Sequence, residues 1–188
     1  VNNVTGNITA NDIQMTAGNG AGGNAMVYIN SNNNLTLITT VAGISLTAGN
    51  THTGNIASLY SGGLLTINSA TDLSLTADWG DALIQSGTGG ANITCGNNFS
   101  LLGGNVANSK AYLTSMVGVQ PLVLNVTNDA TLEGGIAANA DAYITNYNNA
   151  DIDIGNNLNI WGSTPLGGNG PAYIRIDSLA VGQNLVTN

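Results

Sequence analysis

A three-residue unit, in which a polar residue stands between two apolar ones, recurs along the whole chain and sets the strongest limit on its fold. The units fall into three columns, and the members of each column follow one another at intervals of about 29 residues. Because the side chains of a strand alternate between its two faces, each unit predicts a short strand with one buried face. Three such strands in each period, separated by corners rich in Gly and Asn, predict one coil of a parallel β-helix.

Each column has six complete units, and a partial seventh unit of the first column begins at Leu185. The first column holds Ile13–Met15, Ile44–Leu46, Leu73–Leu75, Phe99–Leu101, Ala130–Leu132 and Leu158–Ile160. The second column holds Val27–Ile29, Ala57–Leu59, Ala82–Ile84, Ala111–Leu113, Ala142–Ile144 and Ala172–Ile174. The third column holds Leu35–Leu37, Leu65–Ile67, Ile93–Cys95, Leu122–Leu124, Ile152–Ile154 and Leu179–Val181.

The three columns predict an all-β fold, a single solenoid domain over residues 1–188 with about six coils and no linker. Right-handed winding is favoured over left-handed winding, because the period drifts by several residues while left-handed solenoids prefer short, regular coils. The drift follows the first column, which predicts loops of variable length at one corner. The residues expected to face the core are Ile13, Met15, Ile44, Leu46, Leu73, Leu75, Phe99, Leu101, Leu132, Leu158 and Ile160.

The scarcity of charge limits the partners of this chain. Only 6% of its residues are charged, and Lys and Arg together number 2. Nucleic-acid binding is thereby excluded, because neutralising phosphates takes several basic side chains. No apolar run approaches the roughly 20 residues of a membrane-spanning helix. Cys95 is the sole cysteine and is expected to point inward as a small apolar residue.

The ends of the predicted solenoid lack an amphipathic helix that would cap them. An open β-helix end is an unpaired sheet edge, which proteins normally cover. Two explanations stay open: the chain is cut from a longer solenoid, or identical copies stack head to tail into a filament. Under the second explanation the end-to-end contacts are expected at Val4, Ile8, Leu179 and Leu185.

The middle residues of the second column predict an outward face that is rich in tyrosine. Tyr28, Tyr112, Tyr143 and Tyr173 occupy this position, the last three in successive coils. One interpretation is an aromatic strip that binds glycans or packs fibres side by side. The other is an aromatic ladder that stabilises the parallel sheet.

The polar residues do not single out a catalytic or metal site. Asp151 and Asp153 alternate onto one face, and Asp78 and Asp81 flank a short loop, yet neither pair supplies the six to eight oxygens that calcium prefers. His52 has no suitably spaced partner for a Ser-His-Asp triad or a metal. We therefore expect no enzyme activity, no catalytic residue, no cofactor and no metal.

Two segments, Gly43–Gly49 and Asp72–Ala77, share a phrase of the type Asn/Asp-Leu-x-Leu-x-Ala-Gly. This style of repeat resembles the β-helices of filamentous-haemagglutinin-like adhesins and autotransporter passengers. The resemblance implies a secreted or cell-surface right-handed β-helix used for adhesion or scaffolding, and it carries over no catalytic residue.

The expected function is that of a non-enzymatic extracellular structural protein, either a filament subunit or an adhesin stalk, with glycans or cell-surface receptors as further partners. The alternative is a β-helix that binds or cleaves carbohydrate.

Overall fold

The computed structural model describes residues 5–18, 25–50, 53–116, 120–162, 170–176 and 185–187 of the 188-residue chain. These residues form strands and connecting turns. In this part of the chain no helix is long and apolar enough to cross a membrane. Two of the expected end contacts, Val4 and Leu179, and also His52, lie outside the described residues.

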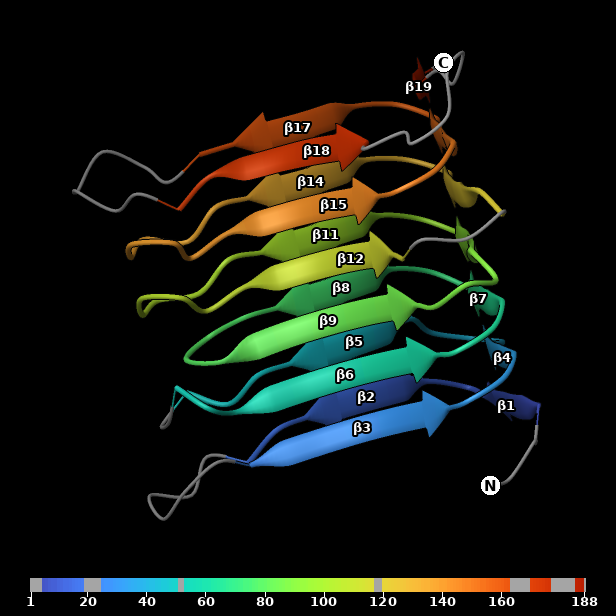
Figure 1. Ribbon diagram of the computed structural model, residues 1–188, viewed down its shortest axis with the longest axis horizontal. Helices are drawn as coiled ribbons and strands as arrows, with labels where there is room; N and C mark the ends of the chain where they lie inside the picture. The colour runs from blue at the N-terminus through green and yellow to red at the C-terminus, as the bar shows by residue number, and fades with distance from the viewer. Residues whose placement is uncertain are drawn as a thin grey trace.

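Three parallel sheets enclose the core, and every complete turn contributes one strand to each of them (Figure 1). In hydrogen-bonded order, sheet A contains β1 (Gly6–Ala10), β4 (Leu35–Thr39), β7 (Leu65–Ser69), β10 (Ala91–Cys95), β13 (Leu122–Val126), β16 (Ala150–Ile154) and β19 (Leu185–Thr187). Sheet B contains β2 (Ile13–Thr16), β5 (Ile44–Thr47), β8 (Leu73–Thr76), β11 (Phe99–Leu102), β14 (Ala130–Glu133) and β17 (Leu158–Trp161). Sheet C contains β3 (Met26–Ser31), β6 (Ile56–Ser61), β9 (Asp81–Ser86), β12 (Ala111–Ser115), β15 (Ala142–Asn146) and β18 (Ala172–Ile176).

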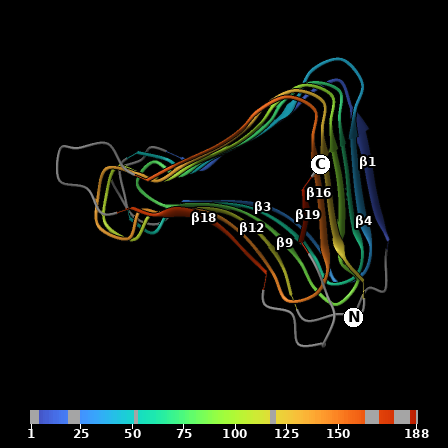
Figure 2. The ribbon, with the colours of Figure 1, turned by 90° about the horizontal axis from the view of Figure 1, so that it is seen from above.

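The strands form a right-handed β-solenoid of about five turns with about 29 residues per turn, close to the six coils expected. Seen from above, the chain rises toward the viewer from β1 to β19 and turns counter-clockwise, which is the right-handed sense (Figures 1 and 2). Sheets B and C converge at a narrow corner opposite sheet A (Figure 2). The connections at this corner vary in length, from residues 77–80 to residues 103–110, as the drift of the period predicts.

The first two columns of the sequence pair in the register that their spacing predicts. Leu73 of β8, for example, lies beside Ile44 of β5 and Phe99 of β11. The predicted register of the third column was wrong by two residues in two turns. The units that align with the others begin at Ala91 and Ala150 and not at Ile93 and Ile152. Ala91–Cys95 alternates over five residues, so two different units fit the pattern equally well. The buried face is unchanged, since a shift of two residues preserves the alternation.

The assignment of Leu185 to the first column was also wrong. Leu185 begins β19, which pairs with β16 through Ala150 and therefore belongs to sheet A, the sheet of the third column. The apolar pattern of a strand gives its buried face but does not identify its sheet. The expected third-column unit at 179–181 lies outside the described residues.

A continuous apolar core fills the space between the three sheets. Nine of the eleven residues expected to face it in sheet B are buried, from Ile13 at 8% exposed to Leu132 at 0%. The other two, Leu158 and Ile160, are 39% and 41% exposed, so their predicted burial was wrong. Both lie on β17, the last strand of sheet B, which pairs with β14 on one side only within the described residues. A solenoid side chain is fully covered only when turns lie both above and below it.

A ladder of Asn and Asp side chains stabilises the corner between sheets A and B. The Asp72 carboxylate accepts hydrogen bonds from the Asn97 side chain at 2.7 Å and from the Asn98 backbone N–H at 3.0 Å. In the next turn the Asp129 N–H donates to the Asn98 side-chain oxygen at 3.3 Å, and the Asp129 carboxylate accepts from the Asn157 N–H at 3.1 Å. We call Asp72, Asn98, Asp129 and Asn157 the corner ladder. It satisfies backbone groups that the sharp corner removes from the sheets.

Candidate functional site

The outward side of sheet C carries the predicted tyrosine face. One row on it runs across all six strands, and neighbouring members of the row are paired in register. In order from β3 to β18 the row consists of Tyr28, Ser58, Leu83, Tyr112, Tyr143 and Tyr173. The placement of the four tyrosines in one row is confirmed. The structure adds that Ser58 and Leu83 separate Tyr28 from the other three.

Tyr112, Tyr143 and Tyr173 form a stack, which we call the tyrosine ladder. The ring centroids of Tyr112 and Tyr143 are 5.0 Å apart with an interplanar angle of 5°, and those of Tyr143 and Tyr173 are 5.2 Å apart with an angle of 6°. These separations are close to the roughly 4.8 Å between neighbouring strands, so the backbone spacing itself brings the rings together. Each ring face inside the ladder therefore covers another ring and is closed to a sugar.

Burial and stacking change the ionisation of the ladder. Burial raises the pKa of Tyr143 above its usual range, and the two stacked tyrosines beside it add to the effect. Burial is also the main cause of the raised pKa of Tyr112 and of Tyr173. Nearby carboxylates act in the same direction, Asp81 on Tyr112 and Asp141 on Tyr173. The folded state thus favours the neutral phenols.

These shifts predict that alkali destabilises the fold through the tyrosine ladder. An unfolded tyrosine ionises near pH 10, whereas the ladder residues hold their protons to higher pH in the folded state. The stabilisation is complete below about pH 10 and is lost as pH rises toward the folded pKa values. The decline of the urea midpoint above about pH 10 should be shallower in Tyr143→Phe than in the parent chain. Tyr28→Phe, an exposed position outside the ladder, is the matched control, and equal slopes in all three chains would contradict this assignment.

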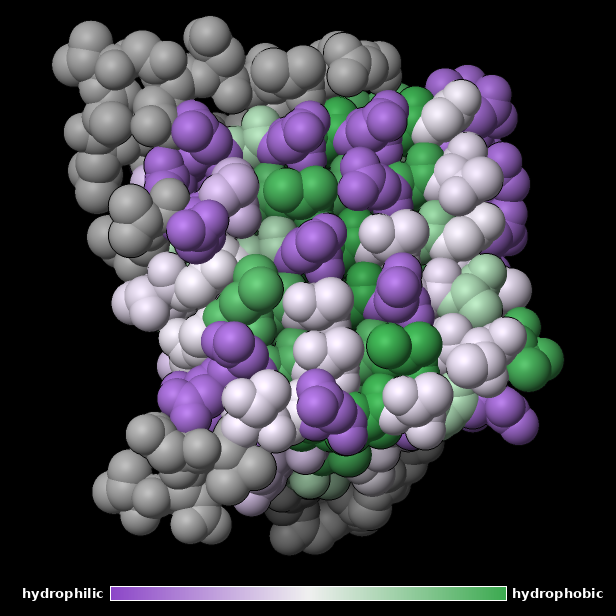
Figure 3. Space-filling model, turned by 90° about the vertical axis from the view of Figure 1, so that its right-hand side faces the viewer, coloured by the Kyte–Doolittle hydropathy of each residue, from purple (hydrophilic) through white to green (hydrophobic). Residues whose placement is uncertain are grey.

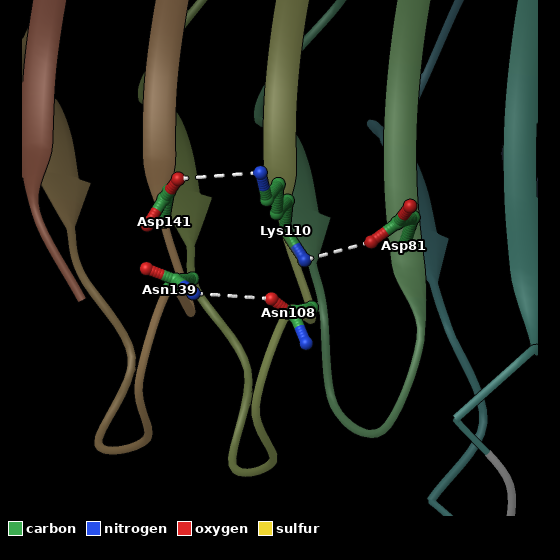
Figure 4. Close-up of polar contacts among 5 residues, drawn as sticks. All are labelled: Asp81, Asn108, Lys110, Asn139 and Asp141. Carbon is green, nitrogen blue, oxygen red and sulfur yellow. Dashed lines mark hydrogen bonds and ion pairs between the residues drawn. The ribbon is translucent and has the colours of Figure 1, made fainter. Parts of the chain in front are cut away.

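A row of charged residues lies beside the tyrosine row, at the start of the sheet C strands (Figure 4). The Lys110 backbone N–H donates to Asp81 Oδ1 at 2.9 Å, and Lys110 Nζ lies 3.5 Å from Asp141 Oδ2 in an ion pair. In the connections that precede β12 and β15, Asn139 Nδ2 donates to Asn108 Oδ1 at 3.2 Å. Burial raises the pKa of Asp81, although the hydrogen bond and the positive charge of Lys110 oppose that shift. Asp81 and Asp141 are two strands apart, and Lys110 lies between them, hydrogen-bonded to Asp81 through its backbone and ion-paired with Asp141.

The sequence analysis does not identify this row. Lys110 lies 29 residues after Asp81 and 31 residues before Asp141. These are the intervals of the solenoid turn, and they are the signal that locates the row in the sequence.

The other candidate residues stay apart from one another. Asp151 and Asp153 lie exposed on the outward side of β16 in sheet A, where hydrophilic, neutral and hydrophobic side chains are interspersed (Figure 3). Asp78 accepts a hydrogen bond from the Asn105 side chain at 2.7 Å. No group of three His, Cys, Asp or Glu side chains suited to a metal ion occurs in the described segments. Cys95 is fully buried as expected, and burial raises the pKa of its thiol to about 12.

The end strands form a second candidate surface. β1, β2 and β3 lie at one end of the three sheets and β17, β18 and β19 at the other (Figure 1). Ile8 lies on β1 and Leu185 on β19, so both lie on end strands. A hollow of about 520 Å³ opens at the N-terminal end and is lined in part by Ile8, Ile29 and Leu35.

The inward side chains of the end strands are incompletely covered. Six of these apolar residues, together with Ile154 of β16 beyond the part of that strand that pairs with β19, are only partly buried against the core, whereas their counterparts in the central turns are buried. They are Ile8, Ala10, Val27 and Ile29 at the N-terminal end, and Ile154, Ala172 and Ile174 at the C-terminal end.

The chain matches no protein-family model, no curated protein and no solved structure. Its fold and surface define its class, a right-handed parallel β-solenoid repeat protein with stacked side-chain ladders on its faces and corners.

Proposed function

We propose that this chain is a non-enzymatic structural β-solenoid of the cell surface, a filament subunit whose ends stack head to tail. One observation carries the proposal: the apolar core continues into both end turns, where its side chains are left partly exposed. Leu158 and Ile160 are 39% and 41% exposed on β17. Apolar side chains on an unpaired strand edge favour the addition of another strand.

The geometry of the ends favours open-ended growth. The two ends of a solenoid are different surfaces, so the contact between them is heterologous and does not close on itself. Each added subunit extends all three sheets in the same parallel sense. Sheets B and C contain six strands and sheet A contains seven, so each copy adds roughly 29–34 Å to the filament at about 4.8 Å per strand.

The tyrosine face supports a structural role better than a glycan-binding one. Sugar rings stack on exposed aromatic faces, whereas the ladder covers both faces of Tyr143 and one face each of Tyr112 and Tyr173 with its own rings. Asp81 and Asp141 interact with Lys110, which supports a stabilising role for these carboxylates. The style of the repeats, which resembles haemagglutinin-like adhesins, supports placement outside the cell. The adhesin stalk differs from the filament subunit only in that its turns belong to a longer chain.

Electron microscopy of the purified chain across a dilution series tests the proposal. The parent chain should give fibres of uniform width with an axial repeat of roughly 29–34 Å. Ile160→Lys places a charge on the exposed end of the core and should abolish the fibres. Val41→Lys, at a corner position that is 68% exposed, is the matched control and should leave them intact.

Stable single particles of the parent chain at micromolar concentration would overturn the filament proposal. A glycan screen of those particles would then test Tyr28, the one tyrosine of the row whose ring lies outside the ladder.

A further inference from the structure

Sheet A is one strand longer than sheets B and C, and this extra strand decides how two copies can join. β19 pairs with the outer edge of β16, whereas β17 and β18 have no strand on their outer edges in the described part of the chain. We propose that β1 of the next copy replaces β19 on β16 when the filament grows, so that β19 is an exchangeable cap. This inference rests on the proposed function and specifies its interface.

The number of layers in each sheet is the first argument. If β1 of the upper copy were added on top of β19, β2 and β3 would lie two layers above β17 and β18. These strands would then be about 9.6 Å apart, twice the spacing of neighbouring strands. Leu158 and Ile160, which are 39% and 41% exposed, would stay uncovered by the upper copy. If β1 takes the place of β19, β2 pairs with β17 and β3 with β18, and all three sheets continue without a gap.

The incomplete pairing of β19 is the second argument. β19 pairs with Ala150, Asp151 and Ile152 only, although β13 pairs with β16 through all five residues from Ala150 to Ile154. β1 also has five residues, Gly6–Ala10, and pairs with all five residues of β4 inside the chain. A strand of this length can cover the part of β16 that β19 leaves open.

The inward residues of β1 suit the outer edge of β16. The register of sheet A is unbroken from β1 to β16. Continued by one layer, it sets Ile8 of the upper copy beside Ile152 and Ala10 beside Ile154. Ile8, Ala10 and Ile154 are each only partly buried in the single chain, so the junction removes apolar surface from water at all three.

The outward residues of β1 are complementary to the two acidic residues of β16. Asp151 and Asp153 are both exposed, and β19 sets Val186, which has no side-chain donor, beside Asp151. In the continued register Asn7 lies beside Asp151 and Thr9 beside Asp153. An amide and a hydroxyl can each donate a hydrogen bond to a carboxylate, and β1 has no acidic residue that would repel one. The exchange therefore provides a donor for each carboxylate.

The axial rise per copy in the fibres measures the number of layers directly. Exchange leaves six layers per copy in every sheet, which is about 29 Å, whereas addition on β19 leaves seven, which is about 34 Å. Helical reconstruction from electron micrographs separates these two values, and we expect about 29 Å. A rise of about 34 Å would overturn the exchange and leave the filament standing.

A disulfide that locks β19 onto β16 tests the exchange in the full chain. Asp151→Cys combined with Val186→Cys puts two cysteines at paired positions of neighbouring strands, about 4.8 Å apart and within the Cα range of a disulfide. The oxidised chain should lose fibre elongation, because the incoming β1 finds no free place on β16. Reduction with dithiothreitol should restore it. Native Cys95 does not compete, because it is fully buried.

The matched control places the same crosslink inside sheet A. Thr36→Cys combined with Thr66→Cys joins β4 to β7 at paired positions, and its oxidation should leave elongation unchanged. Fibres that elongate equally well from the oxidised and the reduced Asp151→Cys/Val186→Cys chain would overturn the exchange alone. If neither the parent chain nor the reduced variant gave fibres, the proposed function would be overturned as well.

Discussion

The Phe99→Ala variant is expected to lose about 3–5 kcal/mol of unfolding free energy. Phe99 is the only phenylalanine of the chain, and its side chain is 0% exposed on β11 in the middle of sheet B. Its in-register neighbours are Leu73 in the turn below and Ala130 in the turn above. Because Ala130 is small, it cannot expand into the space that the ring leaves. The variant therefore loses both the apolar contacts of the ring and the packing of two turns against it.

Urea unfolding followed by circular dichroism measures this loss. Ser100→Ala is the matched control, because Ser100 follows Phe99 on the same strand but lies on the outward side, and its variant should change stability by less than about 0.5 kcal/mol. A loss below about 1 kcal/mol for Phe99→Ala would show that the core closes around the missing ring, in conflict with the close packing described here.

The fold could be predicted largely because the same sequence pattern recurs in every turn of a solenoid. In the first two columns, units such as Leu73–Leu75 and Ala111–Leu113 recur at matching intervals, and each copy supports the assignment of the others. Parallel in-register pairing then follows, since every turn must cover the apolar face of the turn before it.

The errors arose where alternation alone had to decide. Ala91–Cys95 offers two units of identical pattern, and only pairing of Ala91 with Leu65 selects between them. Leu185 was assigned to the wrong sheet for the same reason. The exposure of Leu158 follows from its place on the last strand of sheet B, which the pattern of a single strand does not contain.

The candidate site was predictable in its position but not in its geometry. The spacing of the tyrosines gives the row, and the strand spacing decides that Tyr112, Tyr143 and Tyr173 stack on one another. The position of Lys110 beside Asp81 required the exact register of sheet C. The corner ladder depends on backbone groups that turn away from the sheets, and no apolar pattern reports on these.

The second large effect is expected at the narrow corner between sheets B and C, where glycines let successive connections pack backbone on backbone. A Cβ atom at Gly135 would lie 2.0 Å from the carbonyl oxygen of Gly104 in the turn below. The Gly135 N–H donates to the Ala140 oxygen, which holds the connection in place. Asn108 and Asn139 have left-handed φ values of 67° and 55° in the same two connections, so both follow one tight path.

Gly135→Ala should therefore destabilise the chain by about 3 kcal/mol or more, because the clash is with backbone that cannot rotate away. Gly162→Ala is the matched control, since a Cβ atom at Gly162 would meet no atom of the described residues within 4 Å. Its unfolding free energy should stay within about 0.5 kcal/mol of the parent value. Urea midpoints of the two variants, measured side by side, decide the matter. If both variants were equally stable, the close contact between the 103–110 and 134–141 connections would not exist in solution.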